Sequence, residues 1–135
     1  MLPYFEARRS EYQDELRQVS APGDWDRWVT FFASGLRHQA DETTRKIDDL
    51  VAVHRRTKQV CHANHVQGVA LRLADELIAR PIVTANWVQR QYDVSYPTAN
   101  NAVARLEQLG LLRQFSRGSD GRLFSADEVM QILER

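Results

Sequence analysis

The sequence predicts a mainly α-helical protein, with a helical region over residues 1–65 followed by a winged helix-turn-helix over residues 66–135. Three observations support this prediction. Helix caps and an apolar spacing of three and four residues define two short helices between residues 84 and 110. A glycine-containing turn over residues 117–122, between apolar residues, indicates a β-hairpin. A helical pattern fills most of residues 3–64.

The first helix is expected over residues 3–19, because a proline suits the first helical turn and apolar residues recur along the segment. A Ser-Ala-Pro-Gly break follows, and Asp24 is a good N-cap for the next helix. From there the pattern has no breaker as far as about Asn64, which fits one long helix or two helices joined near His38. Its apolar stripe is aromatic at the start. Periodicity alone does not choose between an intrachain contact and a dimer seam for this stripe.

The winged domain is expected to begin with a helix over residues 66–80, which Pro81 ends. Residues 82–83 then form a short strand that joins the wing. Thr84 can cap the next helix, over residues 85–91.

A turn at residues 93–94 leads into the candidate recognition helix, over residues 95–109. Ser95 is its N-cap candidate, and Gly110 stands at the position after the helix where a left-handed backbone costs least. The apolar face of this helix consists of Ala99, Ala102, Val103, Leu106 and Leu109.

The wing is predicted as a hairpin of residues 111–115 and 123–124 around the turn at residues 117–122. After the wing, Ser125 and Glu128 have the spacing of a capping box, which predicts a final helix.

Charge, cysteine content and hydropathy limit the classes of protein that the chain can belong to. Lys and Arg together number 18, as do Asp and Glu, so the net charge of zero does not itself favour a polyanionic partner. Cys61 is the only cysteine, which excludes an internal disulfide and fits a reducing cytoplasm. Neither a membrane-spanning run nor a signal-peptide core is present. We therefore expect a cytoplasmic protein without membrane association.

The outward side of the candidate recognition helix carries side chains that suit DNA. Asn can bond adenine through two hydrogen bonds, Arg can bond guanine or phosphate, and Tyr and Thr can bond phosphate. Two arginines beside the wing tip suit a phosphate or minor-groove contact. The candidate DNA-binding residues are Tyr96, Thr98, Asn100, Asn101, Arg105, Arg117 and Arg122. The alternative is a winged domain that binds protein, because polar residues are expected on any exposed helix face.

The sequence contains no recognisable catalytic or metal-binding motif. Cys61 and His65 share a helix face next to His62. A fourth metal ligand would have to come from elsewhere, such as His54 or an acidic residue, and surface or linker residues are the default interpretation. A glycine-rich phosphate loop, a His-Glu-x-x-His motif and a nucleophile elbow are all absent. We therefore expect no metal, no cofactor and no enzymatic activity of this chain by itself.

Three segments, in this order, resemble the C-terminal part of Fic-family proteins over nearly the whole chain: YFEARRSEY at residues 4–12, GDWDRWVTFF at residues 23–32 and VSYPTAN at residues 94–100. The resemblance implies a parent protein in which a catalytic Fic domain is followed by helices that complete it and then by a winged helix-turn-helix. It also implies that the parent transfers AMP from ATP to a hydroxyl side chain of a target protein.

The family's catalytic loop, His-Pro-Phe-x-x-Gly-Asn-Gly-Arg, is absent here. Residues 62–65, His-Ala-Asn-His, lack its glycines and arginine, and the family's inhibitory helix is not recognisable either. The chain is therefore expected to be a fragment or short reading frame that begins after the catalytic domain, with residues 1–65 bracing the missing Fic domain. We expect it to be a non-catalytic module that binds DNA or regulates the AMP transferase. The alternative is a protein-interaction and dimerisation module without DNA binding.

Overall fold

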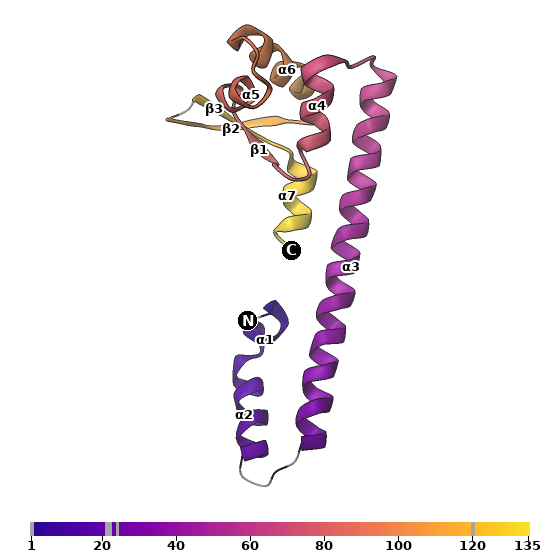
Figure 1. Ribbon diagram of the computed structural model, residues 1–135, viewed down its shortest axis with the longest axis vertical. Helices are drawn as coiled ribbons and strands as arrows, with labels where there is room; N and C mark the ends of the chain where they lie inside the picture. The colour runs from indigo at the N-terminus through magenta and orange to yellow at the C-terminus, as the bar shows by residue number, and fades with distance from the viewer. Residues whose placement is uncertain (1, 21–22, 24, 120) are drawn as a thin grey trace. The chain divides into compact units, whose positions relative to one another are not determined.

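The computed structural model describes residues 2–20, 23, 25–119 and 121–135. It is mainly helical with one three-stranded antiparallel sheet, which confirms the predicted fold class (Figure 1). The predicted cap Asp24, two of the four residues of the predicted break before it and one residue of the wing tip, Asp120, lie outside the described residues. The elements are α1 (Pro3–Ala7), α2 (Arg9–Ser20), α3 (Trp25–Ala63), α4 (Gly68–Glu76), β1 (Ile82–Val83), α5 (Ala85–Tyr92), α6 (Tyr96–Gln108), β2 (Arg113–Gly118), β3 (Gly121–Ser125) and α7 (Asp127–Leu133).

The chain forms two compact units, Met1–Ile47 and Asp48–Arg135, and the boundary lies inside α3. The prediction placed this boundary after residue 65. The difference arises because Val53, Thr57 and Cys61, on the last turns of α3, are buried in the C-terminal unit. None of the helices in the described residues combines the length and apolar character needed to cross a membrane.

The N-terminal unit contains two helices where one was predicted over residues 3–19. Arg8, with φ −119° and ψ 38°, ends α1 before α2 begins. The break accompanies a tight contact of α1 with α3. The backbone N–H of Tyr4 donates to Oε1 of Gln39 at 3.1 Å, and a Cβ on Gly35 would stand only 2.4 Å from the Phe5 ring. Docking of α1 on α3 therefore prevails over the continuous helical pattern.

Aromatic side chains form the core of the N-terminal unit. Phe5 is 2 % exposed and stacks on Phe32 with ring centroids 5.2 Å apart. Tyr12, from α2, meets Trp28 edge-on at 5.4 Å. The helix that carries Trp28 and Phe32 is continuous from Trp25 to Ala63, which decides for one long helix and against a joint near His38.

Cys61 is fully buried in the core of the C-terminal unit, so the prediction that it lies on the surface or in a linker is wrong. Its backbone carbonyl accepts a hydrogen bond from Val66, where the chain turns from α3 towards α4. Burial raises the pKa of the Cys61 thiol. The side chain thus acts as a small apolar core residue.

Two helices of the winged domain, α5 and α6, begin with the side-chain caps that were predicted. Oγ1 of Thr84 accepts the N–H of Trp87 at 3.0 Å, and Oγ of Ser95 accepts the N–H of Thr98 at 3.3 Å. Asp93 takes a left-handed conformation, with φ 51°, in the turn between α5 and α6. Gly110 follows α6 with φ 77°, which only glycine adopts without strain.

The sheet has the strand order β1-β3-β2, and the β2–β3 hairpin extends away from the helices as the wing (Figure 1). Gly118 pairs with Gly121, so the strands continue further than the predicted turn at residues 117–122 allowed. Arg117 and Arg122 are consequently ladder partners within the wing. A register shift lies between Gln114 and Ser116.

The predicted capping box at the start of α7 does not form. Ala126 occupies the N-cap position, and Ser125 is instead the last residue of β3, where it is buried and pairs with both Ile82 and Arg113. Strand pairing on both sides of Ser125 therefore competes successfully with capping. Asp127, the first residue of α7, forms an ion pair with Arg113.

Acid is expected to remove the contribution of Asp127 to stability. The guanidinium of Arg113 holds the pKa of the Asp127 carboxyl below its usual range, so the pair stabilises the fold above about pH 4 and is lost as the pH falls further. We expect Asp127→Asn to lower the urea midpoint at pH 7 and to have a smaller effect at pH 3. Circular dichroism at both pH values measures this difference. An equal effect at the two pH values would contradict it.

Candidate nucleic-acid interface

Helix α6 has one face buried in the core and the opposite face in solvent. Ala99, Ala102 and Leu106 are at most 5 % exposed, and they hold the helix against α4 and α5. Tyr96 is 47 % exposed, and Thr98 and Asn101 are exposed as well. The fold thus presents the polar side of α6 outward, as a nucleic-acid interface requires.

A direct hydrogen bond joins the wing to α6. Nη2 of Arg122 donates to Oδ1 of Asn100 at 3.1 Å, and the guanidinium lies 5.7 Å from the Phe124 ring centroid. This bond brings two of the predicted residues, 22 positions apart in sequence, to one place. Arg117 stands opposite Arg122 in the hairpin and is exposed. Two guanidinium groups therefore lie on the wing next to the polar side of α6.

Arg105 makes a structural contact that the sequence did not indicate. Its Nη2 donates to the backbone carbonyl of Asn64 at 2.9 Å, just beyond the end of α3. The side chain is half-buried, and it connects α6 to the segment that follows α3. The charged group of Arg105, one of the seven predicted residues, is therefore bonded to the backbone of the same chain.

A shallow groove runs along one side of α6. Thr98, Asn101 and Arg105 line it together with Gln67 and Val69, which lie at the start of α4. Gln67 was not predicted, because only the packing of α4 on α6 brings it there. Its exposed amide offers both a donor and an acceptor.

The exposed side of α6 contains two more residues that sequence reasoning missed, Ala104 and Gln108. They lie three and seven positions after Asn101, which places all three on one side of the helix. The small Ala104 permits close approach of a partner, and Gln108 adds an amide at the C-terminal end of α6. The signal was present in the helical spacing, but Ala and Gln are common on any helix surface.

The charge of the interface comes mainly from the wing. The single acidic residue of α6, Glu107, has its Oε2 occupied, since it accepts the backbone N–H of Gln114 at 3.2 Å. This contact fixes the start of β2 against the end of α6. The positive groups that face outward are Arg117 and Arg122, which suit phosphate contacts.

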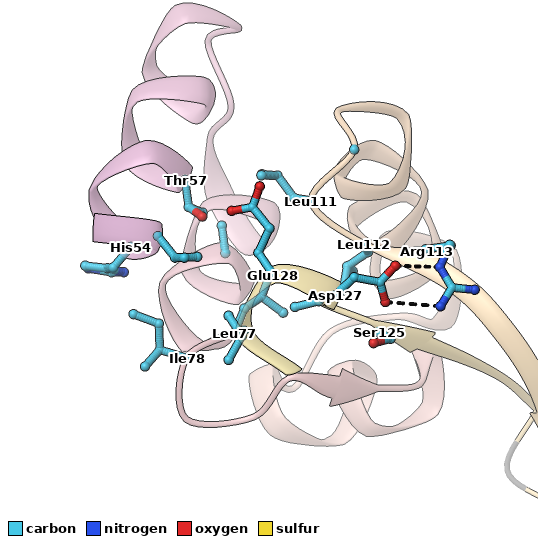
Figure 2. Close-up of a pocket in the computed structure, with 15 residues that line it drawn as sticks. His54, Thr57, Leu77, Ile78, Leu111, Leu112, Arg113, Ser125, Asp127 and Glu128 are labelled. Atoms are coloured by element: carbon cyan, nitrogen blue, oxygen red, sulfur yellow. Dashed lines mark hydrogen bonds and ion pairs between the residues drawn. The ribbon is translucent and has the colours of Figure 1, made fainter. Parts of the chain in front are cut away.

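A separate cavity of about 80 Å³ lies in the C-terminal unit between the end of α3, α4 and the start of α7 (Figure 2). Leu77, Ile78 and Leu112 supply the apolar lining of the cavity. Glu128 also lines it, and its carboxylate forms an ion pair with Arg56. The Arg113–Asp127 pair is also part of its wall (Figure 2). This cavity shares none of the seven predicted residues.

The structure separates the residues that had been considered for a metal. Cys61 is buried, whereas His62 and His65 are exposed. Within residues 2–20, 23, 25–119 and 121–135, no group of three or more His, Cys, Asp or Glu side chains has a geometry that would hold a metal ion.

Comparison of the chain with models of protein families found no match, and neither did comparison with curated proteins.

Proposed function

We propose that the C-terminal unit binds duplex DNA, with α6 in the major groove and the wing on the adjacent backbone. The observation that carries this proposal is the Arg122–Asn100 hydrogen bond, which holds a basic hairpin beside the exposed polar side of a helix. Asn101, near the middle of that side, and Gln108, at its C-terminal end, are exposed and offer amides for base edges. Arg117 and Arg122 supply the phosphate contacts.

Arg105 has a different role in DNA binding from the one predicted from the sequence. Because its guanidinium bonds the carbonyl of Asn64, Arg105 positions α6 and contributes less to the contact with bases. The base-reading residues are then Asn101 and Gln108, while Tyr96 and Thr98 bond phosphates near the start of the helix.

The module is further proposed to belong to a Fic-like protein, where it regulates an AMP transferase in the cytoplasm. Support comes from the resemblance of residues 4–12, 23–32 and 94–100 to the C-terminal part of that family. The N-terminal unit then braces the Fic domain of the parent, and the chain itself carries no catalytic loop. An in-frame sequence for the His-Pro-Phe loop upstream of the Met1 codon would support a Fic-like parent protein. Its absence would indicate a stand-alone module.

A titration of the purified chain with a fluorescent duplex tests DNA binding. We expect the anisotropy to rise and saturate at low salt, since two arginines can contact phosphates. A labelled single strand of the same sequence is the matched control and should bind more weakly. No rise with duplex at low salt would refute DNA binding. Protein interaction, the alternative to DNA binding, would then be the remaining function.

A further inference from the structure

The first turns of α3 expose a row of large apolar side chains. Trp25, Val29 and Leu36 are 63 %, 58 % and 41 % exposed, and Phe32 is 37 % exposed although its ring stacks on Phe5. Helical spacing places Trp25, Val29, Phe32 and Leu36 along one side of the helix, and we call them the α3 stripe. Soluble monomers rarely expose contiguous apolar surface of this kind, so the stripe indicates a partner.

Helices α1 and α2 pack mainly on the side of α3 next to the stripe, and of the stripe residues they contact Phe32. From α1, the Phe5 ring contacts Phe31 and Phe32 and lies against Gly35, while Tyr4 contacts His38 and Gln39. From α2, Tyr12 contacts Trp28 and Phe31 with ring centroids 5.4 Å and 6.5 Å away. The N-terminal unit therefore leaves most of the α3 stripe uncovered.

One flank of the α3 stripe carries two opposite charges. Asp26 and Arg37 each follow a stripe residue, Trp25 and Leu36. They are separated by three helical turns, about 16.5 Å along the axis, and thus share a flank. Both are exposed, and within the described residues neither makes an ion pair. This flank lies away from the side that α1 and α2 cover.

We propose that two copies of this chain associate through the α3 stripe with their helices antiparallel. A twofold axis normal to the plane of the two helices places Trp25 of one copy beside Leu36 of the other, and Val29 beside Phe32. The same axis keeps the charged flanks on one side, so Asp26 of each copy faces Arg37 of the other. In a parallel pair, the two flanks would lie on opposite sides of the seam and these charges would stay unmatched.

The charge pattern favours a second copy of this chain as the partner of the α3 stripe. An apolar stripe alone fits many partners, but a negative and a positive group placed symmetrically about the stripe's midpoint match the same surface inverted. The proposal rests on the N-terminal unit alone and is independent of DNA binding. Its failure would therefore leave the function of α6 and the wing untouched.

Sedimentation velocity on the full chain over a concentration series tests this association. We expect wild type to dimerise with rising concentration. Asp26→Lys and Arg37→Glu should each weaken the dimer about tenfold, because each creates like-charge contacts at two symmetric places. The double variant Asp26→Lys/Arg37→Glu exchanges the charges and should restore dimerisation to within about threefold of wild type. Arg45→Glu, on the opposite side of α3, is the matched control and should change nothing.

Leu36→Asp tests the apolar part of the seam and should also abolish dimerisation, with helicity checked by circular dichroism. A wild-type chain that stays monomeric at every concentration would overturn the proposal. So would a double variant as weak as the single variants, since the Asp26–Arg37 register would then be wrong. A chain that stays monomeric and binds a separate Fic catalytic domain through the α3 stripe would also overturn self-association, and the Fic domain would then be the partner of the stripe.

Discussion

Replacing Leu106 with Ala is expected to lower the free energy of unfolding of the C-terminal unit by about 2–5 kcal/mol. Leu106 is fully buried on the inner face of α6, and the cavity left by its truncation would lie among the side chains that fix this helix. Small domains have a total stability of about 5–15 kcal/mol, so the loss is a large fraction. Urea unfolding followed by circular dichroism measures the change.

Gln108→Ala is the matched control for Leu106→Ala, because it lies on the exposed side of the same helix. Its effect on stability should stay within about 0.5 kcal/mol. A similarly small effect of Leu106→Ala would mean that the inner face of α6 does not carry the packing of the unit, and it would contradict the fold described here.

The double variant Arg117→Ala/Arg122→Ala is expected to bind duplex DNA about 10- to 100-fold more weakly at low salt. Both guanidinium groups lie on the wing, and the loss of Arg122 also removes its hydrogen bond to Asn100. The wing would then lose its phosphate contacts and its connection to α6 together. Fluorescence anisotropy with a labelled duplex measures the affinity.

Removal of positive charge anywhere weakens DNA binding somewhat, so the control must remove the same charge elsewhere. Arg9→Ala/Arg45→Ala does so within the N-terminal unit, at two exposed positions. We expect this control to keep the affinity within about threefold of wild type. Equal losses in the two double variants would show that the wing has no special part in the binding.

Sequence reasoning worked where the deciding interaction is local. Thr84 and Ser95 each bond a backbone N–H three residues away, and Gly110 needs only its own left-handed conformation. Such interactions depend on neighbours in sequence and are readable without the fold. The two helices of the helix-turn-helix were therefore predicted almost to the residue.

The same reasoning failed where distant partners compete with a local pattern. Ser125 has the spacing of a capping box, but pairing with Ile82 and Arg113 keeps it in a strand. Arg8 interrupts a continuous helical pattern as α1 docks on α3. These outcomes depend on residues far away in sequence, which periodicity does not reveal.

The candidate site shows both cases. The polar side of α6 follows from helical spacing alone. In contrast, the contacts of Arg122 with Asn100 and of Arg105 with Asn64 join residues 22 and 41 positions apart, and they decide which guanidinium faces outward. Gln67 enters the groove beside α6 only through tertiary packing. Sequence therefore predicted the helix that carries the site, and the structure was needed to assign roles within it.

The salt dependence of wild-type binding to duplex DNA tests the central claim most directly. Each phosphate contact contributes a slope of about −0.9 to a plot of log affinity against log salt concentration. With the two wing arginines on phosphates, we expect a slope of about −2 or steeper. A slope near zero, or no measurable affinity even at the lowest salt, would contradict the claim that this winged unit binds DNA.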